Sequence, residues 1–388
     1  MTNGRVPHSP EADLRVMISG GGTGGHIFPA IAIANAVREQ VLDARFLFVG
    51  AEGKMEMEKV PAAGYAIEGL PIRGFQRGSI LKNLGLPWRL FRSMMKARHL
   101  VRTFKPHVAV GVGGYASGPV LAAAQRMQVP TLIQEQNSFP GKTNIYLAKR
   151  VDRICVAYEG MDRFFPKGKV IRTGNPVRQE VVRLEGKRPR GMEHFGLSED
   201  KPVLFITGGS LGARGVNRGV EAALKDFQAA GLQVIWQTGT PYHQQAAEAV
   251  ARLRYADCKV HEFVTRMDYA YAVADLVVAR AGAISVSELC LVRKPAILVP
   301  LPTAAEDHQT HNARALTDRG AAVLVKDADA VRDLGPTVLG LINDKQALER
   351  LQVTIADMGV LNAAEMIAVE VIRLGRTKER METTRPRS

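Results

Sequence analysis

The sequence predicts an α/β protein built from two Rossmann-like, doubly wound domains that face one another across a cleft. Two observations support this prediction. Short apolar strands alternate with helices from Leu14 to about Leu374, and this alternation is typical of parallel sheets covered by helices. A strand, a glycine-rich loop and a helix also open each half of the chain, at Gly20–Pro29 and again at Gly208–Arg214. At 388 residues the chain is in addition long for a single core.

The expected domain boundary is the charged stretch 183–201, which contains glycine and proline and is predicted to be a linker. The first domain is then 14–182 and the second is 202–374. Residues 1–13 are expected to be a flexible tail, and residues 375–388 a basic, frayed one.

Further strands are expected in both halves after the first strand, which begins at Leu14. In the first half they are 45–50, 65–70, 106–115, 131–137, 153–157 and 169–174. In the second half they are 202–207, 232–237, 259–264, 276–279, 296–299 and 322–325. Each is short and apolar, as strands buried inside a parallel sheet are.

The composition is that of a soluble globular protein, with 46% hydrophobic and 23% charged residues. The formal net charge of +14 predicts an acidic partner, such as nucleic acid, anionic lipid or a phosphorylated substrate. The three cysteines lack metal-ligand or redox spacing, which suits a reducing compartment. No apolar run approaches the roughly 18 residues that span a bilayer, and the polar start does not resemble a secretory signal.

The first glycine loop has the features of an anion site. Its glycines allow a close backbone approach to a ligand, and the N–H groups at the start of the following helix favour a negative charge. Pro29 is expected to open that helix. His26 lies at the mouth of the loop, where it could act as a base or as a donor to a phosphate.

A dinucleotide site is an alternative interpretation of the same loop. Gly20, Gly22 and Gly25 satisfy the G-x-G-x-x-G pattern, which alone is a weak signal. The first carboxylate after the next strand, Glu52, comes late for reading a ribose. A Walker A loop is excluded because no Gly-Lys-Ser/Thr follows.

Polar groups end three expected strands of the first half. They are His26, Gly113–Tyr115 and Glu135–Asn137. Ligands of doubly wound sheets gather at the carboxyl ends of strands, so these groups are expected to lie together.

The segment 75–102 interleaves basic and large apolar residues and predicts contact with an anionic membrane surface. For the helix expected at Trp88–Arg102, an ordinary helix with its apolar face in the core is an equally good interpretation. The loop Phe75–Leu86 shows no helical core face and better fits an interfacial patch. Nucleic acid is not expected, because the segment matches no binding motif.

The second half has its own polar clusters. Ser285 and Glu288 fit a capping box, and the same positions could bind phosphate and ribose hydroxyls. His308 and His311 lack a third metal ligand. Asp327-Ala328-Asp329 fits a solvated acidic turn better than a metal site.

The motifs taken together resemble the MurG family, the peripheral-membrane N-acetylglucosaminyltransferases of bacterial peptidoglycan synthesis, whose wider relatives are the nucleotide-sugar transferases of the GT-B fold. The resemblance spans about Leu14 to Leu374. It depends on Gly20–Pro29, GVGGYASG at 111–118, Glu135–Asn137 with Thr143 and Asn144, GNPVR at 174–178, GGSLGAR at 208–214, Ala281–Glu288 and the loop around Gln309 and Asn312.

The resemblance implies inverting transfer of GlcNAc from UDP-GlcNAc to the MurNAc 4-hydroxyl of undecaprenyl-diphospho-MurNAc-pentapeptide (lipid I), giving lipid II. It implies no cofactor and no protein-held metal. It also implies a peripheral location on the cytoplasmic face of the plasma membrane and contact with other proteins of cell-wall synthesis.

The resemblance also implies the roles of individual residues. The catalytic residues would be His26, as the base, and Glu288, which would take the ribose hydroxyls. The donor would be bound by Thr23, Gly24, Gly25, Asn137, Arg178, Ser210, Val264, Ala283, Ile284, Ser285, Val286, Ser287, Glu288 and Gln309. The acceptor would be bound by Gly22, His26, Gly113, Gly114, Tyr115 and Glu135.

The chain departs from the family pattern at Gln134, where histidine is common, at Leu211, where glutamine is common, and in the stretch before Gln309. Three other functions remain as alternatives: a nicotinamide-dependent oxidoreductase, a non-catalytic membrane or nucleic-acid binder, and a UDP-GlcNAc epimerase or another nucleotide-sugar enzyme of the same two-domain layout.

Overall fold

The computed structural model describes residues 14–73, 85–209 and 211–383, with the backbone alone for 378–383. The predicted N-terminal tail therefore lies outside the described residues. The chain divides into two compact units. The first unit comprises 1–136, 140–176 and 362–388, and the second comprises 137–139 and 177–361.

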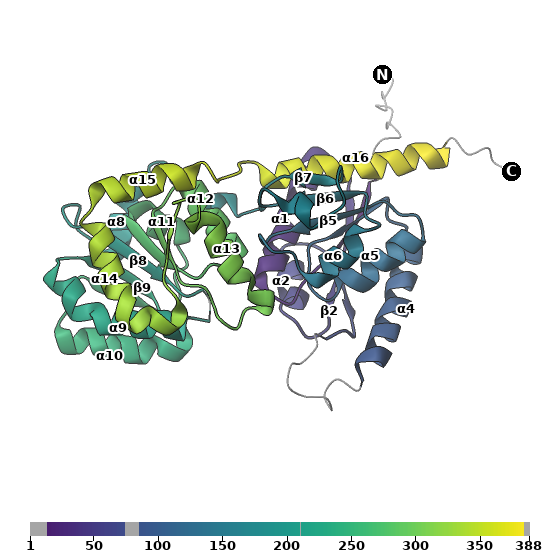
Figure 1. Cartoon of the computed structure of the whole chain (residues 1–388). Coiled ribbons are helices and arrows are strands. Elements are labelled where there is room, and N and C mark those ends of the chain that lie inside the picture. Colours follow the sequence, from purple (N-terminus) through teal and green to yellow (C-terminus); the bar gives the residue numbers. More distant parts are fainter. Residues whose placement is uncertain (1–13, 74–84, 210, 384–388) are drawn as a thin grey trace, which may run out of the picture. The chain divides into compact units, whose positions relative to one another are not determined.

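The first unit is built on a seven-stranded sheet in the order β3-β2-β1-β4-β5-β6-β7. Figure 1 labels β2, β5, β6 and β7 of this sheet. All of its strand pairs are parallel. The strands are β1 (Arg15–Ser19), β2 (Arg45–Ala51), β3 (Ile67–Leu70), β4 (Val108–Gly111), β5 (Thr131–Glu135), β6 (Arg153–Val156) and β7 (Val170–Arg172). The order around β1 is that of a doubly wound sheet, so the carboxyl ends of β1 and β4 are neighbours.

Helices cover both faces of this sheet, because side chains alternate across each strand. On β1, Val16 and Ile18 belong to one core cluster and Met17 belongs to the other. The first cluster receives α1 (Gly24–Gln40) and α16 (Ala363–Thr383), and the second receives α4 (Leu86–Phe104), α5 (Ser117–Arg126) and α6 (Lys142–Ala148). The short helices α2 (Glu56–Ala62) and η1 (Met161–Arg163) complete the unit.

The second unit repeats the topology with six parallel strands in the order β10-β9-β8-β11-β12-β13. They are β8 (Val203–Thr207), β9 (Gln233–Gln237), β10 (Cys258–His261), β11 (Leu276–Ala279), β12 (Ala296–Leu298) and β13 (Val323–Leu324). One face packs against α9 (Arg214–Ala229), α10 (His243–Leu253) and α14 (Ala330–Ile342). The remaining helices are α7 (Gln179–Val182), α8 (Arg188–Phe195), η2 (Thr240–Tyr242), α11 (Met267–Val273), α12 (Ala283–Val292), η3 (Ala305–Asp307), α13 (His308–Thr317), η4 (Asp327–Asp329) and α15 (Lys345–Ala356).

The predicted fold class and strand positions are confirmed, because every expected strand overlaps an observed one. The division of the chain differs from the prediction at two places. Residues 183–201 contain α8, whose Met192 and Phe195 are buried and which packs on α11. The end of the chain forms α16, which returns to the first unit and buries Ile367 and Val371 beside α1. A returning helix leaves no local signal at the point where the chain changes unit.

Candidate active site

The first glycine loop joins β1 to α1, and α1 begins at Gly24 rather than at Pro29. The expected helix start is therefore wrong by five residues, because the two glycines and His26 already form the first turn. Thr23 is the N-cap, and its side chain makes no capping bond. The first N–H groups of a helix have no acceptor within it, so those at Gly24 and Gly25 are suited to an external anion.

His26 is half-buried, and its Nδ1 side is held by the same loop. Nδ1 lies 3.1 Å from the carbonyl oxygen of Gly21 and 3.3 Å from Oγ1 of Thr23. A carbonyl oxygen can only accept, so a hydrogen bond to Gly21 requires the proton of the neutral ring to be on Nδ1. In that tautomer the lone pair is on Nε2, which is the form that a general base requires.

The second glycine loop follows β4 and lies against the first. Gly113 and Gly114 have φ angles of +94° and +84°, which favour glycine. A Cβ on Gly113 would lie 2.9 Å from Nε2 of His26, and one on Gly114 would lie 2.4 Å from the Gly21 oxygen. Tyr115 follows with 55% of its surface exposed. The structure thus brings together the predicted acceptor residues at the ends of β1 and β4.

Glu135 ends β5 but is only 2% exposed. Its Oε2 accepts hydrogen bonds from Nδ2 of Asn144 at 2.8 Å and from the N–H of Gly141 at 3.1 Å. Gly141 is the N-cap of α6, so this carboxylate fixes the start of α6. Its predicted contact with an acceptor stays a prediction.

Gln134 replaces the family's common histidine and is fully buried. Its Nε2 donates to Oδ1 of Asn175 at 2.9 Å, and Nδ2 of Asn175 donates to the carbonyl of Gln136 at 3.0 Å. Gln134 therefore takes part in a polar network between the end of β5 and the GNPVR motif.

Asn137 belongs to the second unit together with Ser138 and Phe139. Asn312 of α13 holds this segment: its Oδ1 accepts from the N–H of Ser138 at 2.9 Å and its Nδ2 donates to Oδ1 of Asn137 at 3.1 Å. Asn312 is fully buried. The predicted donor residue Asn137 is thus positioned by a residue of the second unit.

Glu288 lies on α12 and is 4% exposed. Oε1 accepts from Nη2 of Arg178 at 3.4 Å, and Oε2 accepts from the hydroxyl of Tyr271 at 3.2 Å. Burial raises the pKa of this carboxyl, although Arg178 and Tyr271 act in the opposite direction. The helix begins at Ala283 with Gly282 as its N-cap and no side-chain capping bond, so the capping box of Ser285 and Glu288 is not formed.

The GGSLGAR loop joins β8 to α9, and Gln237 at the end of β9 holds it. Nε2 of Gln237 donates to the carbonyl of Gly209 at 2.9 Å, and its Oε1 accepts from the N–H of Val264 at 2.9 Å. The backbone N–H of Val264 is therefore engaged within the protein. Ser210 lies outside the described residues, and Leu211, a departure from the family pattern, is 85% exposed.

The unusual stretch before Gln309 has an unusual backbone. Glu306 and Asp307 both have φ of +54°, a left-handed conformation that costs energy in residues with side chains. Gln309 follows in the first turn of α13, and its Oε1 accepts from the N–H of Leu301 at 2.9 Å. Strain of this kind is typical of functional sites, which supports the assignment of this loop to the donor.

The acidic turn at Asp327 forms η4. Asp327 pairs with Arg280 at 2.6 Å, and Asp329 pairs with Arg332 at 3.2 Å. His308 contacts the carbonyl of Ala305 through Nδ1. Within the described ranges, no group of three or more His, Cys, Asp or Glu side chains is arranged to hold a metal ion.

The predicted site residues therefore fall into two sets. Gly22, Thr23, Gly24, Gly25, His26, Gly113, Gly114, Tyr115 and Glu135 are in the first unit. Asn137, Arg178, Val264, Ala283, Ile284, Ser285, Val286, Ser287, Glu288 and Gln309 are in the second. Sequence reasoning missed Glu56, Gln237 and Tyr271, which hold these residues. A polar side chain at the end of a buried strand, as at Gln237, is the one signal that could have indicated such a role.

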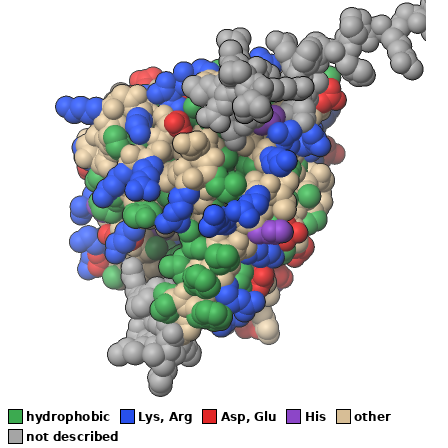
Figure 2. Space-filling model, turned by 90° about the vertical axis from the view of Figure 1, so that its right-hand side faces the viewer, with side chains coloured by type: hydrophobic (Ala, Val, Ile, Leu, Met, Phe, Trp, Pro, Cys, Tyr) green, Lys and Arg blue, Asp and Glu red, His purple; other side chains and the backbone are tan. Residues whose placement is uncertain are grey.

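Helix α4 has features of both interpretations of the basic segment, a core-packed helix and an exposed apolar surface. Its C-terminal half buries Ala97, Leu100 and Val101 in the core. Its N-terminal half exposes Trp88, with 64% of its surface accessible, and Phe91, with 55%. Figure 2 shows hydrophobic side chains gathered on one face of the molecule among lysines and arginines. The loop 75–84 lies outside the described residues.

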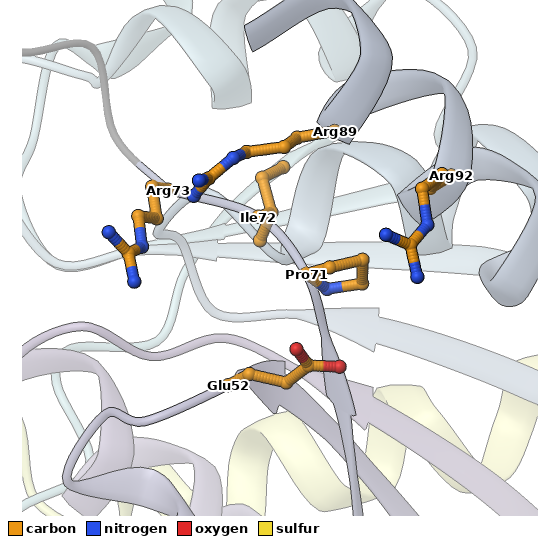
Figure 3. Close-up of a pocket in the computed structure, with 6 residues that line it drawn as sticks. All are labelled: Glu52, Pro71, Ile72, Arg73, Arg89 and Arg92. Atoms are coloured by element: carbon orange, nitrogen blue, oxygen red, sulfur yellow. The ribbon is translucent and has the colours of Figure 1, made fainter. Parts of the chain in front are cut away.

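A cavity of about 280 Å³ adjoins the start of α4 (Figure 3). It is lined by Glu52, Pro71, Ile72, Arg73, Arg89 and Arg92. In Figure 3, Arg89 extends from α4 toward Arg73, and Arg92 lies on the other side of Pro71. Three guanidinium groups near one carboxylate give this region a net positive charge, which favours anions.

No helix in the described parts of the chain combines the length and apolar character needed to cross a bilayer.

Comparison with known proteins defines the class first. Residues 16–156 match the glycosyltransferase family 28 N-terminal domain, and residues 203–366 match the glycosyltransferase family 28 C-terminal domain. The two matches coincide with the two sheets, so the chain is a glycosyltransferase of this family.

Curated relatives show more specifically which enzymes of this family the chain is similar to. The chain is 51% identical to a protein of Parabacteroides distasonis over 93% of the chain and 98% of that protein. It is 53% identical to a protein of Bacteroides fragilis over 93% of the chain and 96% of that protein. Both relatives are named UDP-N-acetylglucosamine--N-acetylmuramyl-(pentapeptide) pyrophosphoryl-undecaprenol N-acetylglucosamine transferase. The chain belongs to this family of N-acetylglucosamine transferases, as its motifs predicted.

Solved structures agree with this assignment. The crystal structure of MurG from Acinetobacter baumannii has a TM-score of 0.76 at 26% identity, and covers 93% of this chain and 99% of its own. A UDP-GlcNAc 2-epimerase from Neisseria meningitidis has a TM-score of 0.64 at 14% identity, covering 93% of this chain and 99% of its own, and shares the fold alone.

Proposed function

We propose that this protein transfers GlcNAc from UDP-GlcNAc to the MurNAc 4-hydroxyl of undecaprenyl-diphospho-MurNAc-pentapeptide with inversion, giving lipid II and UDP. The observation that carries the chemical part of the proposal is the contact of His26 Nδ1 with the Gly21 carbonyl oxygen. It leaves Nε2 basic beside Gly113, at the edge of a second glycine loop.

In the proposed mechanism, Nε2 of His26 takes the proton of the acceptor hydroxyl as the hydroxyl oxygen attacks the anomeric carbon of GlcNAc. The bond from that carbon to the β-phosphate oxygen breaks, and UDP leaves with its electron pair. The backbone of the two glycine loops binds the acceptor's diphosphate, and the N–H groups of Gly24 and Gly25, in the first turn of α1, bind the donor. Positioned N–H donors stabilise such charge without the reorganisation that water would need.

The second unit supplies the other contacts with the donor in this mechanism. Glu288 accepts hydrogen bonds from the ribose hydroxyls. Arg178, which pairs with Glu288, also stabilises the departing diphosphate. The start of α12 and the GGSLGAR loop contribute N–H donors to the phosphates. Gln309 binds the sugar. No cofactor or protein-held metal takes part.

Incubation with UDP-GlcNAc, with and without a lipid I analogue, tests the proposal. Release of UDP only when the acceptor is present, together with a disaccharide product, is the expected result. Conversion of UDP-GlcNAc to UDP-ManNAc without acceptor would instead identify an epimerase, and binding of NAD(P)H would identify an oxidoreductase. Either result would overturn the proposal.

We further propose that the start of α4 contacts an anionic membrane surface, where the polyprenyl acceptor resides. Trp88, Leu90 and Phe91 supply exposed apolar surface, and Arg73, Arg89 and Arg92 supply positive charge around the cavity. Each basic residue near such a surface contributes about 1 kcal/mol. The contact would place the enzyme on the cytoplasmic face of the plasma membrane, within reach of other proteins of cell-wall synthesis.

Co-sedimentation with phospholipid vesicles tests this contact. Binding is expected to vesicles containing anionic phospholipid and to weaken in the W88S/F91S and R89E/R92E variants. Matched controls are V353S, at an apolar position 65% exposed on the second unit, and K225E/K345E, at exposed basic positions there. Equal loss of binding in the controls, or binding independent of anionic lipid, would contradict the proposal.

A further inference from the structure

Glu56 is a buried carboxylate that holds the first glycine loop. It is the first residue of α2 and is 1% exposed. The N–H of Gly22 donates to both of its oxygens, at 3.2 Å and 3.0 Å, and the N–H of Ala51 donates to Oε1 at 3.0 Å. Hydrogen bonds to a carboxylate are shorter and stronger than those between neutral groups. The loop is therefore anchored by charge at the peptide between Gly21 and Gly22.

The fold leaves room for this carboxylate at two glycines. A Cβ on Gly21 would lie 2.1 Å from Oε1 of Glu56, and a Cβ on Gly50 would lie 2.5 Å from its Cγ. Gly21 also has a φ of +149°. Any larger residue at either position would push the Glu56 side chain out, so the backbone is shaped around it.

The peptide group that Glu56 holds is the one that contacts His26. The N–H of Gly22 and the C=O of Gly21 belong to the same peptide unit, and in a trans peptide they point in opposite directions. Glu56 binds the N–H end, while the C=O end lies 3.1 Å from Nδ1 of His26. Fixing one end of this unit therefore fixes the other.

We infer that Glu56 is a positioning residue for His26, acting through the Gly21–Gly22 peptide, and that it keeps the proton of the neutral ring on Nδ1 and strengthens the ring as a base. The inference rests on the proposed function, in which His26 accepts the proton of the sugar hydroxyl. A carboxylate bound to the N–H polarises the amide and makes its carbonyl oxygen a better acceptor. The negative charge also stabilises the imidazolium that forms when Nε2 takes a proton.

The same contact limits what the loop can offer an anion. The N–H of Gly22 donates to Glu56, so it is already used within the protein. In the proposed mechanism, the acceptor's diphosphate would then be bound by the other N–H groups of the two glycine loops. Gly22 would serve the reaction through His26.

The titratable groups described at the ends of β4 and β5 are engaged elsewhere or face outward. Glu135, at the end of β5, accepts from Asn144 and Gly141. Tyr115, in the loop after β4, is 55% exposed. Glu56 is thus the carboxylate joined to His26 by a continuous series of hydrogen bonds.

The test compares E56Q with the full-length wild type by NMR titration of His26 in 15N-histidine-labelled protein without substrate. Its signals are assigned from the H26N variant. In the wild type, the neutral ring should carry its proton on Nδ1. In E56Q, the titration midpoint of the ring should fall by about 0.5–1 pH unit, because a nearby negative charge is lost.

The activity readout should change in parallel. For E56Q we expect kcat to fall about tenfold and the acid limb of the pH–rate profile to move to lower pH by the same amount as the NMR midpoint, since that limb reports the base. The KM for UDP-GlcNAc should stay within twofold. In an H26A background, E56Q should have no further effect on kcat.

E58Q is the matched control, because Glu58 lies on the same helix, carries the same charge and is exposed. It should leave the midpoint, kcat and KM unchanged. If E56Q does not fold, two other measurements still test whether Glu56 positions His26: the tautomer of His26 in the wild type and the titration of His26 in E56D, which keeps the charge. In E56D, the titration midpoint should stay within about 0.3 units of the wild-type value.

Two results would overturn the inference: a neutral His26 with its proton on Nε2, or an unchanged midpoint in folded E56Q. The NMR arm needs no turnover, so it can fail while the transferase assay succeeds. Conversely, an inactive transferase with the expected titration would overturn the proposed function and leave the link between Glu56 and His26 in place.

Discussion

The two glycine loops that open the two units have the same topology but are held by different chemistry. After β1, the charged side chain of Glu56 accepts the N–H of Gly22. After β8, the neutral amide of Gln237 donates to the carbonyl of Gly209. Gln237 ends the strand next to β8, and Glu56 begins the helix that follows the strand next to β1.

This difference teaches how one motif can serve two roles. A carboxylate suits a loop that supports a base, because it stabilises the protonated histidine. The same charge would oppose a phosphate at the Gly21–Gly22 peptide, whose N–H it already occupies, whereas the amide of Gln237 adds no negative charge to the second loop. In the proposed mechanism, the charge of the holding residue therefore distinguishes the loop that supports the base from the second loop, which binds the donor.

The largest expected effect tests whether the first loop supports the base. H26A should lower kcat by about 100- to 10,000-fold, the usual contribution of a general base. The dissociation constant for UDP-GlcNAc, measured by calorimetry, should stay within twofold. Loss of donor binding together with turnover would show that His26 belongs to the donor site and would break the comparison.

The next effect tests the donor role of the second unit. E288A should weaken UDP binding about 10- to 100-fold, since a hydrogen bond to a charged group contributes about 1.5–3 kcal/mol. Y271F, which removes one of the bonds that orient Glu288, should weaken binding less. A larger effect of Y271F than of E288A in calorimetry would contradict the role given to Glu288.

A charge exchange in the second loop tests the comparison directly. Q237E should weaken UDP binding about tenfold at pH 8, because a buried carboxylate would face the diphosphate. The loss should shrink near pH 5, where the new carboxyl becomes protonated. Q237M, which also removes the amide but adds no charge, is the control; equal affinity losses in both variants at every pH would show that charge is irrelevant there.

The smallest effect concerns stability. Burial raises the pKa of Glu288, so the native state binds this proton more tightly than the unfolded state does. The wild-type free energy of unfolding should therefore fall as pH rises from the unfolded pKa, about 4.3, through the higher native value. E288Q has no titrating carboxyl at this position, so its free energy of unfolding lacks this pH dependence.

Urea unfolding from pH 4 to 8 measures this pH dependence. The difference in unfolding free energy between the two proteins should change in favour of E288Q as pH rises through the native pKa and then stay constant. E349Q, at an exposed position of α15, should show no such trend. A trend of the opposite sign would mean that Arg178 outweighs burial.

Much of this fold could be predicted because buried parallel strands are short apolar runs in any context. The start of α1 could not, because glycine and histidine have weak helix propensity and Pro29 is a more conspicuous signal. The return of α16 to the first unit depends on packing between segments more than 300 residues apart, such as Val16 and Ile367. No local pattern encodes such a contact.

The candidate site shows a similar limit. Motifs indicated the groups that would touch substrates, such as His26 and Glu288. They did not indicate Glu56 or Tyr271, since a carboxylate or a phenol has no recognisable spacing from the group that it holds. Such supporting contacts are set by the tertiary fold.

The place of α16 has a consequence for how the chain folds as it is made. Ile367 and Val371 complete a core whose other members begin at Leu14. All of the second unit's residues leave the ribosome before α16 does. The second unit can therefore mature during translation, while one apolar face of the first unit's sheet is only partly covered until α16 arrives.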